Sequence, residues 1–301
     1  MIFKRHFYIC AFLSSIIMFG CTNNDIPIKD KEEEKPPVED EEKPALPPDE
    51  DTEVTLFKIS LLNLDYPGLG AVKSLHEAGD DNTALKELLA YYINRENIKN
   101  PNVTSASPSE VERGYADYAI DEYRFYVNDN YLEDKNLKKP YSLQNSDKTI
   151  NWEFAPKGAD NEYQKQLHRH NWMPLQGKAY QNSHDEKYVL SWKEVYTDWI
   201  TRNPKPDGKP DKFKWYQLQV STRIMGQTES FEYFKSSPNF TSEWLSFFLI
   251  HFAEHADYLS LYKYAGENNI LLSQAVALVF AGTLFPELKN APQWQKTGCD
   301  I

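Results

Sequence analysis

The sequence predicts an all-α protein, an α/α toroid in which antiparallel helix pairs form an incomplete barrel behind an N-terminal leader and a tether. Apolar residues recur at helical spacing over most of residues 81–284. Short breaks rich in Pro, Gly, Asn and Asp separate these stretches, so neighbouring helices are expected to pair antiparallel. An open superhelical solenoid is the alternative, but the irregular helix lengths and the lack of a fixed-period repeat favour the toroid.

The first twenty residues (1–20) have the pattern of an export signal. Lys4 and Arg5 precede an apolar run, residues 7–19, that is too short to span a bilayer comfortably. The run leads into Met18-Phe19-Gly20-Cys21, which resembles the lipobox of bacterial lipoproteins. We expect Cys21 to be lipidated and to anchor the protein in the cell envelope, on the outer-membrane surface or in the periplasm. An ordinary cleaved signal peptide is the alternative.

Residues 21–54 have the composition of a disordered tether. Residues 22–54 contain thirteen Asp or Glu, four Lys, six Pro and no aromatic residue. Such a segment buries too little apolar surface to offset the entropy of ordering. An acidic run behind a lipidated cysteine resembles the surface-export signal of gut Bacteroidetes lipoproteins, and a solvated spacer is the alternative.

The tether carries most of the negative charge. Of the net charge of −12, the leader accounts for +2 and the tether for −9, which leaves −5 for residues 55–301. The whole-chain charge argues against nonspecific nucleic-acid binding. The three cysteines are Cys10, Cys21 and Cys299, so the folded part can form neither a disulfide framework nor a Cys-based metal site. We expect a monomer whose domain requires no cofactor or metal.

Residues 55–301 are long enough for one large helical domain. Polar residues mark where the helices begin, such as Asp81, Ser109 and Thr241, and the Pro- and Gly-containing segment 203–208 ends one of them. Residues 125–155 break the helical pattern. Helices are expected at about residues 81–93, 107–119, 161–181, 185–202, 212–235, 241–265 and 268–284.

An ordered series of motifs runs through this domain. The series comprises Ile150-Asn151-Trp152-Glu153-Phe154-Ala155-Pro156, Tyr163-Gln164-Lys165-Gln166-Leu167-His168-Arg169-His170, Gly177-Lys178-Ala179-Tyr180, Asp185-Glu186-Lys187-Tyr188, Trp215-Tyr216-Gln217-Leu218 with Arg223, Asn268-Asn269-Ile270-Leu271-Leu272, Phe280-Ala281-Gly282, Phe285-Pro286-Glu287 and Trp294. In this order the series resembles the N-terminal domain of heparinase III-like members of the heparinase II/III polysaccharide lyases. The resemblance spans residues 55–301.

The resemblance implies a helical toroid that forms one wall of a cleft for an acidic glycosaminoglycan such as heparan sulfate. The reaction would be β-elimination, in which a base removes the proton at C5 of a uronic acid and the bond from C4 to the leaving oxygen breaks. Because that proton lies beside a carboxylate, the site must neutralise carboxylate charge with amide, imidazole or guanidinium groups. A base and an acid complete the set.

Two residues are predicted to be catalytic from their match to the family's motifs. Asn269 matches the Asn of an Asn-His motif whose amide binds the uronate carboxylate, although Ile270 stands where the His would follow. His170 matches the His of an Arg-His pair. A structural histidine is the alternative for His170. A helix cap is the alternative for Asn269, with Asn268 as its rival.

Five further residues are predicted to bind substrate: Gln166, Arg169, Arg223, Trp152 and Trp215. Gln166 precedes the predicted catalytic histidine by one helical turn. The two arginines could pair with sulfate or carboxylate in a bidentate way, with surface salt bridges as the alternative. The tryptophans could stack on sugar rings, with core packing as the alternative.

Two functional hypotheses follow. The first is a polysaccharide lyase, because of the resemblance. The resemblance also places the family's catalytic Tyr and a second catalytic His, in a C-terminal β-sandwich, beyond Ile301, so the chain alone could be inactive. The second is a non-catalytic glycan-binding surface lipoprotein or a truncated, inactive fragment. Other classes have weaker support, since no carboxylates are marked as a glycosidase pair, and His251 and His255, at metal-binding spacing, are better explained as core or solvated histidines.

Overall fold

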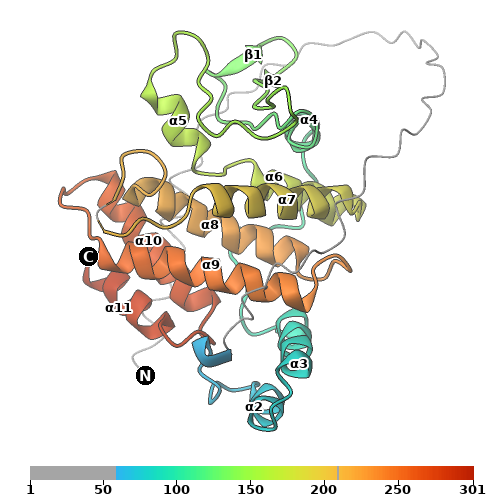
Figure 1. Ribbon diagram of the computed structural model, residues 1–301, viewed down its shortest axis with the longest axis vertical. Coiled ribbons are helices and arrows are strands. Elements are labelled where there is room, and N and C mark those ends of the chain that lie inside the picture. Colours follow the sequence, from blue (N-terminus) through green and yellow to red (C-terminus); the bar gives the residue numbers. More distant parts are fainter. Residues whose placement is uncertain (1–58, 209) are drawn as a thin grey trace. The chain divides into compact units, whose positions relative to one another are not determined.

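The computed structural model describes residues 59–208 and 210–301, all within the unit 55–301. The predicted signal peptide, Cys21 and the tether lie outside the described residues. The described chain is mostly helical, as the sequence predicted (Figure 1). The elements are η1 (Ile59–Leu61), α2 (Gly70–Glu77), α3 (Asp81–Asn94), α4 (Glu110–Tyr118), β1 (Leu132–Asp134), β2 (Lys139–Pro140), α5 (Asn161–Leu167), α6 (Met173–Ser183), α7 (Lys187–Arg202), α8 (Gln217–Phe234), α9 (Ser242–Leu261), α10 (Asn269–Leu284) and α11 (Ala291–Asp300).

Several helices begin where a side chain satisfies their first backbone N–H groups. Asp80 caps α3, and Thr241 caps α9. Ser109 and Glu112 form a reciprocal capping box at α4. These side chains accept hydrogen bonds from N–H groups that have no partner inside the helix. Local sequence therefore fixes where these helices start.

The helix expected over residues 161–181 is two helices, α5 and α6, and Pro174 accounts for the break. Proline lacks an N–H, and inside a helix its ring clashes with the carbonyl four residues earlier, here that of His170. The chain avoids the clash because His170 adopts the left-handed conformation, with φ of +58°. Its carbonyl instead accepts a hydrogen bond from Met173 N at 3.1 Å.

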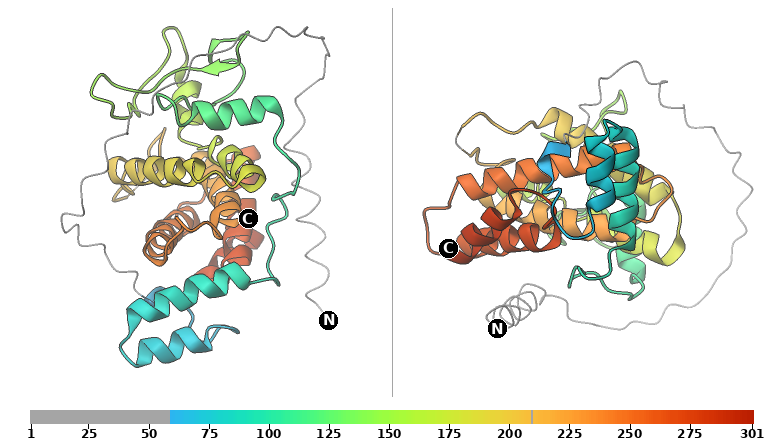
Figure 2. Two further views of the ribbon diagram at one scale, coloured as in Figure 1. Left: turned by 90° about the vertical axis from the view of Figure 1, so that its right-hand side faces the viewer. Right: turned by 90° about the horizontal axis from the view of Figure 1, so that it is seen from below.

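Helix α8 lies at the centre of the packing, since α6, α9 and α10 all contact it (Figure 2). Helix α10 also packs on α11, and α2 on α3. The α10–α11 contact is close enough to require glycine, because a Cβ at Gly298 would lie 2.6 Å from Ala275 O. The core is rich in aromatic residues, and its largest fully buried side chains include Trp172, Trp192, Trp199, Trp294, Tyr92, Tyr163, Tyr196, Phe125, Phe231, Phe234 and Phe240.

A buried ion pair fastens α3 to the connection between α10 and α11. Arg95 Nη1 donates to both carboxylate oxygens of Glu287, at 2.9 and 3.1 Å. The hydroxyls of Tyr91 and Tyr92 also donate to this carboxylate, at 2.8 and 3.3 Å. A buried charge pair is tolerated only when further hydrogen bonds satisfy it, and here the two tyrosines do so.

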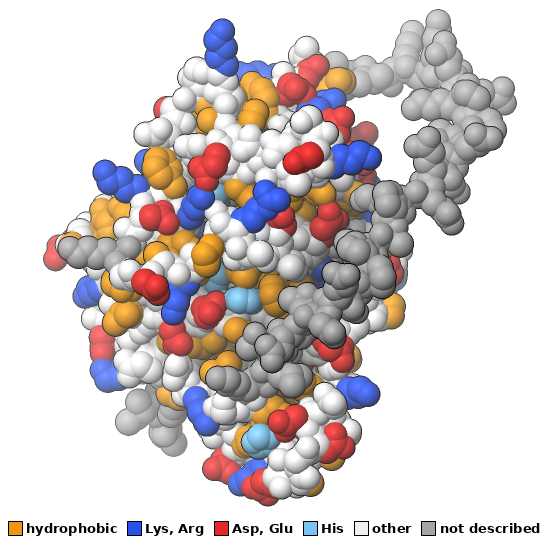
Figure 3. Space-filling model, viewed as in Figure 1, with side chains coloured by type: hydrophobic (Ala, Val, Ile, Leu, Met, Phe, Trp, Pro, Cys, Tyr) orange, Lys and Arg blue, Asp and Glu red, His pale blue; other side chains and the backbone are white. Residues whose placement is uncertain are grey.

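Outside the helices, β1 and β2 form a small antiparallel hairpin within the irregular region that the sequence predicted. None of the helices in the described ranges has the length and apolarity of a membrane span. On the face seen in Figure 3, acidic and basic side chains are interspersed.

Candidate active site

Two connections meet at one end of the helices and form what we call the rim, residues 203–208, 210–216 and 262–268. The first joins α7 to α8 and the second joins α9 to α10. Because consecutive antiparallel helices alternate in direction, both connections lie at the same end (Figure 1). Gln217 Nε2 donates to Tyr262 O at 3.3 Å, and the rings of Tyr216 and Tyr264 meet edge to face with centroids 6.1 Å apart. These contacts hold the two connections together.

Helix α10 begins at the rim with two asparagines that have different roles. Asn268 is the cap, since its Oδ1 accepts from Ile270 N at 2.9 Å. Its Nδ2 also donates to the Tyr264 hydroxyl at 3.3 Å. Asn269 is the first helical residue and is exposed, and within the described chain its side-chain amide makes no hydrogen bond. The capping role therefore falls to Asn268, and the Asn269 amide is available to a ligand.

A hollow of about 770 Å³ opens beside this helix start, and we call it the Tyr264 hollow. Tyr264 and Asn268 give it a polar side, and the first turns of α10 give it an apolar side. Its lining residues are Lys263, Tyr264, Ala265, Gly266, Glu267, Asn268, Leu271, Leu272, Ala275 and Ile301.

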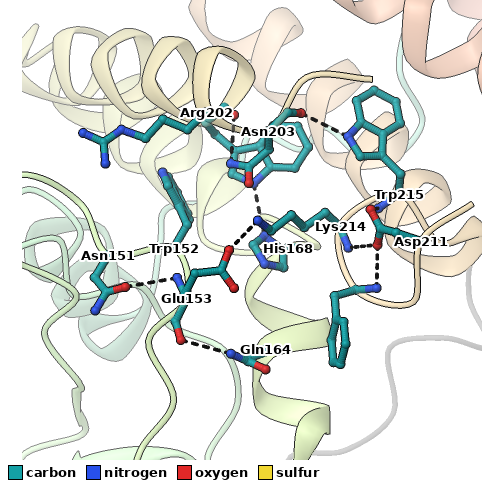
Figure 4. Close-up of polar contacts among 12 residues, drawn as sticks. Asn151, Trp152, Glu153, Gln164, His168, Arg202, Asn203, Asp211, Lys214 and Trp215 are labelled. Carbon is teal, nitrogen blue, oxygen red and sulfur yellow. Dashed lines mark hydrogen bonds and ion pairs between the residues drawn. The ribbon is translucent and has the colours of Figure 1, made fainter. Parts of the chain in front are cut away.

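A second hollow of about 350 Å³, the Lys214 hollow, is lined in part by the rim residues Asp211, Phe213 and Lys214. Figure 4 shows Glu153 and Lys214 pointing toward each other across it, where they form an ion pair. The Asp211 carboxylate accepts from the backbone N–H groups of Phe213 and Lys214, both at 2.6 Å. The lining residues are Glu153, Gln164, His168, Asp211, Phe213 and Lys214.

Arg223 lies behind the Lys214 hollow and joins its walls. Its Nη1 donates to His168 O at 2.7 Å and to Lys214 O at 2.6 Å, and its Nε donates to His255 Nε2 at 3.1 Å. The guanidinium also lies over the Trp199 ring, 4.3 Å from the centroid. Burial lowers the pKa of Arg223 to about 9. It is fully buried, and its Nη1 and Nε donate to backbone carbonyls and an imidazole, while its Nη2 has no partner among the described residues, so Arg223 positions the hollow and does not reach solvent.

Three buried histidines surround this arginine. His168 Nδ1 accepts from Trp199 Nε1 at 3.2 Å, and burial lowers the pKa of His168 to about 3. His255 donates from Nδ1 to His251 O at 2.7 Å while its Nε2 accepts from the arginine. Both His255 nitrogens are therefore occupied, which leaves no lone pair for a metal ion. Burial and the nearby arginine also lower the pKa of His255.

His170 is the third, and its surroundings are unusual. Its ring meets Trp199 edge to face at 4.8 Å and lies 5.1 Å from Trp172, centroid to centroid. Burial, with a smaller contribution from Arg223, lowers its pKa. Neither ring nitrogen has a hydrogen-bond partner in the described structure. A strained backbone and an unpaired buried imidazole together mark a position that carries a constraint beyond packing.

The other predicted residues have structural partners. Gln166 accepts from Asn128 Nδ2 at 2.6 Å and donates to Glu162 at 3.1 Å. Arg169 also pairs with Glu162, at 2.8 Å, in the manner of the salt-bridge alternative. Trp152 and Trp215 are 4% and 2% exposed, which favours core packing over stacking on sugar.

The structure gathers most of the predicted residues but not all. His170, Arg223 and both tryptophans belong to one buried cluster around Trp199. Asn269 lies at the start of α10 and is not in contact with His170 in the described part of the chain. Apart from Asn268, sequence reasoning named no residue of the two hollows as a site residue, although Asp211-Lys212-Phe213-Lys214-Trp215-Tyr216 mixes charged and aromatic residues just before a helix, as a binding segment does.

Comparison with known proteins gives one consistent result. The family model described as Heparinase II/III N-terminus matches residues 57–301. The chain is 49% identical over 300 residues to a heparin-sulfate lyase of Bacteroides thetaiotaomicron, which covers 99% of the chain and 42% of the relative. It is 39% identical over 261 residues to a heparin-sulfate lyase of Bacteroides stercoris, covering 80% of the chain and 37% of the relative.

Solved structures agree with the sequence matches. A crystal structure of heparinase III aligns with a TM-score of 0.77 and 53% identity, over 83% of this chain and 37% of that one. The heparan sulfate lyase HepC from Pedobacter heparinus aligns with a TM-score of 0.69 and 35% identity, over 80% of this chain and 37% of that one. The described helices therefore match the N-terminal helical part of these structures, and the chain spans about two fifths of their length.

Proposed function

Because this chain belongs to the heparinase II/III N-terminal family, we propose that it forms the helical part of a polysaccharide lyase acting on uronic-acid-containing glycosaminoglycan such as heparan sulfate. The relatives named heparin-sulfate lyase support this substrate class. The chain covers 42% of the first of them, so the whole reaction is part of the proposal.

The observation that carries the proposal is the exposed amide of Asn269 at the start of α10. The neighbouring Asn268 performs the capping role and lines the Tyr264 hollow, while Asn269, which does not line it, has an exposed amide that is free to donate to a uronate carboxylate bound at the start of α10. Negative charge on the uronate grows as the C5 proton leaves. A donor held there on a rigid helix would stabilise the transition state more than the bound substrate.

The base and the acid of the elimination are assigned through the family resemblance. It places a Tyr and a second His beyond Ile301, and His170 is the histidine that it assigns within this chain. His170 is buried and neutral. It would therefore either support the neighbouring side chains of the site or contact substrate only after the surrounding residues open locally. We propose that no cofactor is needed in this domain, that it binds as a monomer, and that nucleic acid is not a partner.

The test measures binding and turnover separately. Isothermal titration with a uronate-hexosamine tetrasaccharide should show binding by the 301-residue chain. The ultraviolet absorbance of an unsaturated uronate product should show little elimination, because each missing proton-transfer group typically removes about 10²–10⁴-fold in rate. Rapid product formation would place the acid and base within this chain, with Tyr163 and Tyr180 tested first. Failure to bind the tetrasaccharide would contradict the proposal.

We also propose that the protein is a lipoprotein of the cell envelope. The support is the lipobox-like sequence ending at Cys21 and the acidic tether behind it. Cys21→Ala should move the protein from the membrane fraction to the soluble fraction or block its processing. Unchanged fractionation, with retained incorporation of radiolabelled fatty acid, would contradict lipidation at this residue.

A further inference from the structure

The Lys214 hollow has features of a second binding position on the rim. Rim residues line both hollows, 263–268 at the Tyr264 hollow and Asp211, Phe213 and Lys214 at the Lys214 hollow. Lys214 lines one hollow, while Tyr216 meets Tyr264 of the other. The two hollows are therefore connected through contacts within the rim.

The backbone of Lys214 is held from two sides. Its N–H donates to Asp211 Oδ1 at 2.6 Å, and its carbonyl accepts from the buried Arg223 at 2.6 Å. The side chain above it is 27% exposed, with its ammonium at the hollow. A cation on a fixed backbone is a prepared binding group, since little conformational freedom remains to be lost on binding.

Glu153 forms the ion pair with the Lys214 ammonium, and only its side chain is free to move. Its backbone is fixed, because its carbonyl accepts from Gln164 Nε2 at 3.0 Å and its N–H donates to Asn151 Oδ1 at 3.1 Å. Its side chain is 70% exposed, so rotation about its own bonds releases Lys214 into solvent. Exposed ion pairs of this kind contribute about 0–1 kcal/mol, so a ligand can displace Glu153 at small cost.

The charges behind the hollow favour an anion once Glu153 has moved. Asp211 already accepts backbone N–H groups of Phe213, Lys214 and Trp215, which offset its charge. Arg223 adds a positive charge that forms no ion pair with any described carboxylate. The His168 ring also borders the hollow, and because its Nδ1 accepts from Trp199, its proton lies on Nε2 as a donor.

We propose that the Lys214 hollow is a second saccharide subsite, in which the carboxylate of a uronate unit displaces Glu153 from Lys214 while the sugar ring lies against Phe213. In the free protein, the Glu153 carboxylate therefore occupies the position that the ligand's carboxylate would take. This inference rests on the proposed glycosaminoglycan function, but it assigns a site outside the Asn269 region.

The test uses the full chain and isothermal titration with an unsulfated uronate-hexosamine tetrasaccharide. Lys214→Ala should weaken binding about tenfold, the size expected for one lost charge-assisted hydrogen bond. Lys212→Ala is the matched control, since Lys212 is an exposed lysine of the same segment, and should leave affinity unchanged. Lys214→Arg should retain most of the affinity. Circular dichroism of each variant checks that the fold is intact.

Glu153→Gln gives a prediction of opposite sign. Removing the internal competitor should tighten binding about two- to fivefold, within the range of an exposed ion pair. In Lys214→Ala the same Glu153→Gln change should have no effect, because the two residues act on one contact. Tightening that persists without Lys214 would mean only general repulsion by Glu153 and would overturn the proposal.

A carboxyl-reduced tetrasaccharide separates carboxylate recognition from sugar recognition. Lys214→Ala should not change its affinity, and a sulfated tetrasaccharide shows whether sulfate can take the same place. If the wild type binds no tetrasaccharide, the proposed function fails. If the wild type binds but Lys214→Ala behaves like Lys212→Ala, the subsite is refuted while the proposed function stands.

Discussion

Arg223 donates from Nε to His255 Nε2, and this bond fixes His255 as a neutral imidazole with its proton on Nδ1. A protonated His255 could not accept that bond, so the arginine and the charged histidine exclude each other. His168 and His170, also buried near Arg223, share this preference for the neutral form. The cluster around Trp199 is therefore stable only with a single positive charge.

The first prediction is a loss of stability in mild acid. The folded pKa values of His168, His170 and His255 lie below the ordinary 6.5, so below pH 6.5 the unfolded chain binds more protons than the folded one. The free energy of unfolding should fall as the pH drops from 7.5 to 5.5, by up to about 1.4 kcal/mol per pH unit for each histidine. Urea denaturation across this range measures it. A constant stability would contradict the neutral cluster.

Protonation of Glu229 should raise the free energy of unfolding over part of the same pH range, and a Glu229 variant can isolate this contribution. Burial raises its pKa to about 7, so between about pH 7 and its ordinary 4.5 the folded chain binds the extra proton, and stability rises as the pH falls. Glu229→Gln removes that contribution and keeps an oxygen for Asn102 Nδ2. The variant should lose stability more steeply than the wild type between pH 7 and 5. Parallel profiles would show that Glu229 ionises normally.

Arg223 should be among the most destabilising positions to change. Arg223→Met removes three hydrogen bonds and leaves the carbonyls of His168 and Lys214 buried without that donor. The expected loss is about 3–5 kcal/mol in the free energy of unfolding. Arg202→Met, at a half-exposed arginine of α7, should cost less than about 1 kcal/mol. Equal losses for the two variants, measured by urea denaturation, would argue against a central role for Arg223.

The buried Arg95–Glu287 pair should show strong coupling. Arg95→Met alone leaves a buried carboxylate with only tyrosine donors, and Glu287→Leu alone leaves a buried guanidinium, so each should cost about 3–5 kcal/mol. The double variant should cost much less than the sum, because no unpaired charge remains. The exposed Lys296–Asp300 pair serves as a control expected to show little coupling. Additive losses at Arg95 and Glu287 would contradict the assignment.

The two asparagines at the start of α10 should separate stability from ligand binding. Asn268→Ala removes the cap and should cost about 1 kcal/mol of stability. Asn269→Ala removes an amide with no internal partner, so its stability should stay within about 0.5 kcal/mol of the wild type. Its affinity for the uronate tetrasaccharide should fall, and in an enzyme with measurable turnover kcat should fall more than KM rises. The reverse pattern would transfer the binding role to Asn268.

Sequence reasoning succeeded where a helix is set by local features. The helices α3, α4 and α7 fall close to the expected ranges, because apolar spacing and capping side chains act within a few residues. The break between α5 and α6 was not predicted. The sequence contains its cause, since Pro174 inside a continuous helix would clash with the carbonyl of the residue four positions earlier. Helix α8 starts at Gln217 and not near residue 212, because the Asp211 carboxylate binds the N–H groups of the loop that follows it.

The site was harder to predict, because burial depends on segments far apart in the sequence. Arg223 looks like a surface ligand in the sequence, but carbonyls from residues 168 and 214 and a histidine at 255 enclose it. Trp152 and Trp215 likewise became core residues once α7 and α9 packed around them. The role of Asn269 stays a prediction from its motif, while the Lys214 hollow arises only when residues 153, 164 and 214 come together.

The Arg95–Glu287 pair also affects when during synthesis the fold can be completed. The two residues are 192 positions apart, so at about 5–20 residues per second a ribosome makes the carboxylate roughly 10–40 s after the guanidinium. Until then Arg95 lacks the carboxylate that neutralises its charge in the buried position. Such a long-range closure delays complete folding. If residues 1–20 act as the proposed export leader, that delay would help to keep the newly made chain unfolded for passage through a translocation channel.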